Sequence, residues 1–94
     1  MPQPDQINIK AKDEVLAGVY ANAAQISHNK EEFIMDFISL FAPQATLNAR
    51  VIMSPGHMKR LLRAVQENVQ RYETSFGVIK ESEGPKTEFG FPIE

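Results

Sequence analysis

The chain contains no cysteine and no tryptophan, and no long run of apolar residues. Without cysteine it has no disulfide framework, no thiol nucleophile and no cysteine metal site. No apolar run approaches the roughly 20 residues that a membrane-spanning helix needs. The polar N-terminus also lacks the apolar core of a signal peptide. These absences predict a cytoplasmic protein.

Net charge is also small, because 10 Lys and Arg residues nearly balance 12 Asp and Glu residues, for a formal charge of −2. This balance argues against general binding of nucleic acid or of a membrane surface by the whole chain. The 94 residues allow one compact domain. A domain of this size buries only about 60–65% of its unfolded surface, so oligomerisation would help to stabilise it.

Prolines and glycines divide the chain into three parts. Residues 1–6 carry two prolines and little that can pack, and residues 78–94 contain two glycines and two prolines among charged residues. Both ends are predicted to be loose, as an N-terminal arm and a C-terminal tail. A single domain is predicted over residues 7–77.

The domain is predicted to be α+β, an antiparallel meander of three to four strands followed by one long amphipathic helix. Three segments are predicted strands: residues 15–26, 32–41 and 45–53. Residues 27–30 read as a turn, because Ser and Asn side chains bond their own backbone, and Pro43 ends the second strand. A fourth, edge strand over residues 7–11 is left open.

The helix has the most regular pattern in the chain. Ser54 can accept the free N–H groups of its first turn, and Pro55 fits the first helical position. Seven apolar residues then recur at spacings of three and four: Met58, Leu61, Leu62, Val65, Val69, Tyr72 and Phe76. The helix is predicted to end before Gly77 and to pack this stripe on one face of the sheet.

The second predicted strand is apolar on both faces. One face carries Phe33, Met35, Phe37 and Phe41, and the other carries Ile34, Ile38 and Leu40. In the third strand, Leu47, Val51 and Met53 share one face and Ile52 lies on the other. One helix covers only one face, so the face of Ile34, Ile38, Leu40 and Ile52 is predicted to form a homodimer or a higher even oligomer. Cover by the chain's own N-terminal strand or tail is the alternative.

Asp36 interrupts the second strand in its middle, where an unpaired carboxylate is costly. Counting back from a hairpin centred near Pro43 places Asp36 opposite Arg50. The two are predicted to form a cross-strand ion pair, which penalises a wrong strand register more than it adds stability.

Basic side chains crowd the start of the helix, where positive charge opposes the helix dipole. They are His57, Lys59, Arg60 and Arg63. We expect this cluster to face an anionic partner, and an acidic protein surface more than a substrate. The alternative is a solvated surface in which Glu67 pairs with Arg63 and Arg71 at i,i+4 spacing.

Phe89, Phe91 and Ile93 alternate in the tail, so an extended segment presents all three on one side. Such a segment either docks on a sheet edge or a neighbouring subunit, or it is a frayed terminus.

No catalytic residue, cofactor or metal site is predicted. The two histidines, His28 and His57, lack metal-ligand spacing, and Ser54 is explained by helix capping. The residues therefore do not indicate an enzyme.

Six motifs, taken in order, resemble the bacterial domain-of-unknown-function family 3467. They are Tyr20-Ala-Asn, Ile26-Ser-His, Glu32-Phe-Ile-Met-Asp-Phe, Ala49-Arg-Val-Ile-Met-Ser-Pro, Lys59-Arg-Leu-Leu and Asn68-Val-Gln-Arg-Tyr-Glu. The resemblance spans about residues 18–77 and implies a small prokaryotic protein with no established activity. The order of strands before a helix is also similar to half of a SecB-type export chaperone.

Two classes of function follow. The first is a non-enzymatic, homo-oligomeric interaction or adaptor module, chaperone-like in one form, that binds itself and a protein partner. The second is a nucleic-acid-associated protein that uses the basic helix start. The acidic pI of about 5.7 counts against the second class.

Overall fold

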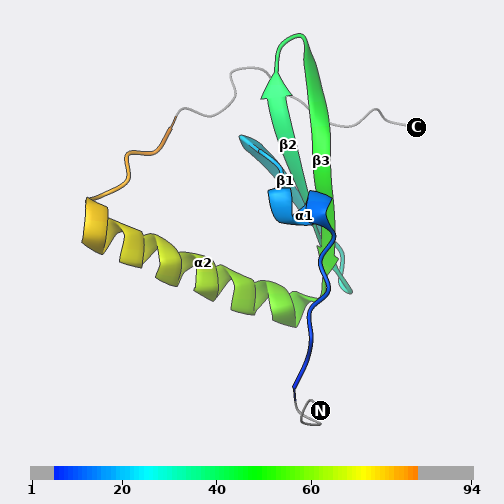
Figure 1. Ribbon diagram of the computed structural model, residues 1–94, viewed down its shortest axis with the longest axis horizontal. Coiled ribbons are helices and arrows are strands. Elements are labelled where there is room, and N and C mark those ends of the chain that lie inside the picture. The colour runs from blue at the N-terminus through cyan, green and yellow to red at the C-terminus, as the bar shows by residue number, and fades with distance from the viewer. Residues whose placement is uncertain (1–5, 83–94) are drawn as a thin grey trace.

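The computed structural model describes residues 6–82, which form a short helix, a three-stranded sheet and a long helix (Figure 1). The elements in chain order are α1 (Asp13–Ala17), β1 (Ala23–His28), β2 (Phe33–Phe41), β3 (Gln44–Met53) and α2 (Pro55–Phe76). The strands pair antiparallel in the order β1-β2-β3. The predicted α+β meander followed by one long helix is confirmed.

The first predicted strand is wrong over residues 15–22, which contain the end of α1 and a loop. Asp13 and Glu14 occupy the first turn of α1, where acidic charge complements the helix dipole. Gly18 then ends the helix at φ 82°, a left-handed conformation that interrupts any strand through this position. Residues 7–11 form no strand, so the described sheet has three strands.

The turn between β1 and β2 lies two residues later than predicted. As predicted, an Asn side chain in it forms hydrogen bonds with nearby backbone groups. The Oδ1 atom of Asn29 accepts hydrogen bonds from the backbone N–H groups of Glu31, at 2.8 Å, and Glu32, at 2.9 Å. The backbone N–H of Asn29 donates to the carbonyl of Glu32 at 3.0 Å. This local bonding lets β1 continue to His28 before the chain reverses.

The hairpin of β2 and β3 contains an irregularity that the alternation pattern did not reveal. Phe37 pairs with Ala49 and Ile38 pairs with Leu47, so Asn48 is an extra residue in β3. An extra residue reverses the side-chain alternation beyond it. Leu47 therefore shares a face with Ile38, and its predicted placement with Val51 and Met53 is wrong.

The boundaries of α2 are as predicted. The Oγ atom of Ser54 accepts a hydrogen bond from the N–H of His57 at 3.2 Å. Pro55 is the first helical residue. Gly77, at φ 98°, donates its N–H to the carbonyl of Glu73 at 2.9 Å and closes the last turn.

The predicted packing of α2 on the sheet is not found within the single chain. The helix projects away from the strands and makes no extensive contact with them (Figure 1). Ser54 is the only residue between β3 and α2, and its backbone is extended. Helix connections usually span about 2–6 residues, so this one is too short to turn the helix back over the sheet.

The core of the chain is very small. Within residues 6–82 the only buried hydrophobic side chain is that of Ile38, which is 4% exposed. The buried polar residue is Asp36, at 5%. Both belong to the central strand β2. None of the 22 residues of α2 is buried.

Candidate functional site

The predicted ion pair between Asp36 and Arg50 is confirmed. The residues are directly opposite in β2 and β3. The Nε and Nη2 atoms of Arg50 donate to the two carboxylate oxygens of Asp36 at 2.7 and 3.0 Å. The Asp36 side chain is 6% exposed, whereas that of Arg50 is 49% exposed. The bidentate pair therefore has a buried anion and a cation that still reaches water.

These hydrogen bonds lower the pKa of Asp36 below its ordinary value of 3.8, although burial acts in the opposite direction. A carboxyl group with a depressed pKa in the folded state stabilises the fold above the unfolded pKa. That stability is lost as the pH falls through the folded pKa. We therefore expect the melting temperature to fall below about pH 4, more steeply than in the double variant Asp36→Leu with Arg50→Leu. Thermal melts between about pH 7 and pH 2 measure this difference.

The single variants separate the two partners. Arg50→Leu should destabilise more than Asp36→Leu, because it leaves the buried carboxylate without its partner while Asp36→Leu leaves a half-exposed guanidinium. The double variant should recover part of the loss. The pair would not be a stabilising unit if two results were found together. The melting temperatures of the wild type and the double variant would change equally with pH, and the two single variants would lower the melting temperature by the same amount.

The predicted oligomer face is only partly open in the single chain. Ile34 and Leu40 are partly covered and Ile38 is buried, whereas Ile52 is 54% exposed. Leu47 joins this face through the irregularity at Asn48. The face therefore contributes to the small core as well as to the surface.

The four predicted basic residues lie within the first nine residues of α2, and all are exposed. The Nη2 atom of Arg60 lies 3.2 Å from the Nδ1 atom of His57. Lys59 and Arg63 form no ion pair among the described residues. The alternative in which Glu67 pairs with Arg63 and Arg71 is not formed there either. The cations are therefore available to a partner.

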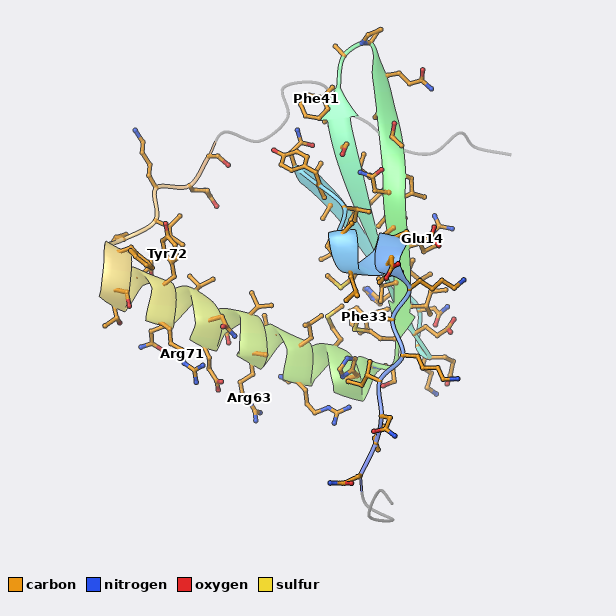
Figure 2. All side chains as sticks on the ribbon, in the orientation of Figure 1. Glu14, Phe33, Phe41, Arg63, Arg71 and Tyr72 are labelled. Carbon is orange, nitrogen blue, oxygen red and sulfur yellow. The ribbon has the colours of Figure 1, made fainter. Side chains whose placement is uncertain are left out.

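The apolar stripe of α2 faces the side on which the sheet lies. Figure 2 shows Tyr72 on the side of α2 toward the sheet, with Arg63 and Arg71 on the opposite side. Phe33 and Phe41 lie on the side of the sheet toward α2. The stripe remains open in the single chain, since its residues from Leu62 to Phe76 are 41–76% exposed.

A polar clamp ahead of β1 was missed by the sequence-based reasoning. The carbonyl of Tyr20 accepts hydrogen bonds from Ser39 Oγ at 2.8 Å and from Asn48 Nδ2 at 2.6 Å. The Asn22 side chain accepts from the N–H of Leu40 at 2.7 Å and donates to its carbonyl at 3.1 Å, as a strand backbone does. Polar residues inside otherwise apolar strands, such as Ser39 and Asn48, were the available signal. The clamp fastens the segment before β1 to β2 and β3.

The remaining predictions concern metal binding, membrane spans and the two chain ends. Within residues 6–82, no three His, Cys, Asp or Glu side chains are grouped so that they could hold a metal ion. No helix in this part is both long enough and apolar enough to cross a membrane. Phe89, Phe91 and Ile93, with most of the predicted tail and arm, lie outside the described residues.

The comparison with protein families gives one result for this chain. The family model described as protein of unknown function (DUF3467) matches residues 1–81. Neither the curated proteins nor the solved structures include a match to the chain.

Proposed function

Because the chain belongs to this family of proteins of unknown function, we propose its role from its surface: a non-enzymatic, homo-oligomeric interaction module that binds a protein partner. The observation that carries the proposal is the exposure of its apolar residues. Within residues 6–82 only Ile38 is buried among the hydrophobic side chains, and the stripe of α2 is open from Leu62 to Phe76.

The energetics support this reading. Soluble monomers rarely expose contiguous apolar patches larger than a few hundred Å². In α2 the exposed apolar residues recur along one side of a 22-residue helix, which is about 33 Å long. A helix with one apolar side gains most of its stability from packing that side against a neighbour. A second copy supplies such a neighbour without requiring another protein.

A protein partner fits the remaining features of the surface. The exposed cations at the start of α2 suit an acidic partner surface, and an unfolded chain as partner would make the role chaperone-like. The second candidate, a nucleic-acid-associated role, is favoured by Lys59 and Arg63, which form no ion pair among residues 6–82. In that role the affinity of the protein for an oligonucleotide would fall steeply with added salt, because contacts with phosphate groups release counterions.

We expect the purified chain to be a dimer or a higher even oligomer at micromolar concentration. Light scattering coupled to size-exclusion chromatography gives the mass directly. The absorbance at 260 nm of the same peak reports co-purified nucleic acid. A monomeric mass would contradict the oligomeric proposal, and an oligomer carrying nucleic acid would favour the second candidate over the first.

A further inference from the structure

The apolar stripe of α2 follows the heptad pattern of paired helices. Six of its seven residues alternate by four and three positions: Met58, Leu62, Val65, Val69, Tyr72 and Phe76. In heptad notation Leu62, Val69 and Phe76 are at a, and the other three are at d. Leu61, at g, is the one stripe residue outside a and d. An apolar stripe confined almost entirely to a and d is typical of the narrow seam of two packed helices, whereas a helix lying on a sheet usually has a broader apolar face.

The residues beside this seam carry a charge order that is complementary to itself. The e positions are Lys59, Gln66 and Glu73, which read positive, neutral and negative along the helix. Residues at e meet e positions of the neighbour when two helices are antiparallel. When a second copy of the helix lies antiparallel beside the first, each Lys59 therefore meets the partner's Glu73, and Gln66 meets its own copy.

We propose that α2 packs antiparallel against α2 of a second copy, with Lys59 of each chain beside the partner's Glu73. This inference rests on the proposed oligomer and names its interface. The pair is centred near residue 67. The stacked layers are Met58 with the partner's Phe76, Leu62 with the partner's Tyr72, and Val65 with the partner's Val69, together with their symmetry mates.

The antiparallel order also accounts for the position of Lys59. In its own helix it lies in the first turn and a half, where the dipole disfavours positive charge. In the pair it lies beside the C-terminal end of the partner helix, where the dipole favours it. Glu73 uses its Oε2 atom to accept from the N–H of Ile79 at 2.8 Å, and its second oxygen remains for Lys59.

The chain connection agrees with this orientation. Because α2 begins one residue after β3, an antiparallel pair places the two sheets at opposite ends of the seam. A parallel pair would place both sheets at one end, and its e positions would meet the uncharged g positions Leu61, Asn68 and Ser75. The alternative is that the stripe of α2 packs on the sheet of the second copy, on the sheet face that carries Phe33 and Phe41.

Charge reversal tests the pairing directly. Lys59→Glu and Glu73→Lys should each weaken self-association roughly tenfold or more, because each replaces two attractions in the symmetric dimer by two repulsions. Lys59→Glu adds negative charge near the start of α2, which the dipole favours, so its effect cannot come from a weakened helix. An equimolar mixture of the two variants restores both pairs, and it should form heterodimers with nearly wild-type affinity. Sedimentation or light scattering across a dilution series gives these affinities.

The control is Arg60→Glu, at the heptad position f that points away from the seam; it should leave the dimer affinity unchanged. The outcomes separate the proposals. A monomeric wild type overturns both the oligomer and the helix pair. A stable dimer whose affinity is unchanged by both charge reversals overturns the helix pair and places the dimer interface on the sheet. Weakened variants that do not rescue each other overturn the antiparallel order.

Cross-linking gives an independent measurement of the orientation. The chain has no cysteine, so single cysteines can be placed at will. Gln66 lies near its own copy in the antiparallel pair, whereas Ser75 lies roughly 24 Å from its copy along the seam. A short bifunctional thiol reagent should therefore join Gln66→Cys dimers and not Ser75→Cys dimers. Efficient joining through Ser75→Cys would overturn the proposal.

Discussion

Ile38→Glu is expected to prevent the chain from folding. Ile38 lies in the central strand and is 4% exposed, and no other hydrophobic side chain among residues 6–82 is buried. An unpaired charge placed there costs several kcal/mol. A small domain has only about 5–15 kcal/mol of stability in total. Far-ultraviolet circular dichroism should show loss of the strand signal and of a cooperative melt.

Ile52→Glu is the matched control. Ile52 shares the face of Ile38 but is 54% exposed, so the new carboxylate keeps most of its water. We expect this variant to fold with a melt close to that of the wild type. It also tests the oligomer face predicted from the sequence, since a folded but dissociated Ile52→Glu variant would move the interface from α2 to the sheet. A normally folded Ile38→Glu variant would show that β2 is not the core.

Much of the sheet was predictable because its signals are local. Pro43 fixed the end of β2, and counting residues back from it was sufficient to pair Asp36 with Arg50. The count succeeded because two offsets cancel. The turn is centred between Ala42 and Pro43, half a residue before the assumed centre, and the extra residue Asn48 restores the pairing of Asp36 with Arg50. Ser54, Pro55 and Gly77 located α2 to the residue, since capping depends on side chains within four positions.

The remaining features depend on contacts that a local pattern does not encode. Leu47 changed faces because one extra residue in β3 reverses the alternation, and nothing in the residue types near Asn48 demands it. The segment before β1 resembled a strand by composition, yet Gly18 and the Tyr20 clamp give it another path. The stripe of α2 indicated that the helix is buried but not which surface buries it. Packing on the sheet of the same chain was inferred, whereas α2 makes no extensive contact with that sheet.

The largest effect on assembly is expected from Val69→Asp. Val69 stands beside the centre of the proposed seam and is 41% exposed in the single chain. In the symmetric pair the substitution buries two unpaired carboxylates, which should raise the dissociation constant on the order of a thousandfold or more. Gln70→Asp is the matched control, because it adds the same residue one position along, on the polar side of the helix. It should remain dimeric.

The same variant tests whether assembly and the folding of α2 are coupled. A helix of 22 residues with no buried side chain is only marginally stable in water, since propensity alone seldom sustains an isolated helix. The Val69→Asp monomer should therefore show a weaker helical signal at 222 nm than Gln70→Asp at equal concentration, and the signal should not change on dilution. The wild type should lose the same signal when it is diluted below its dissociation constant. A Val69→Asp monomer with the full helical signal would show that α2 folds unaided, and a Val69→Asp dimer would show that the stripe is not the interface.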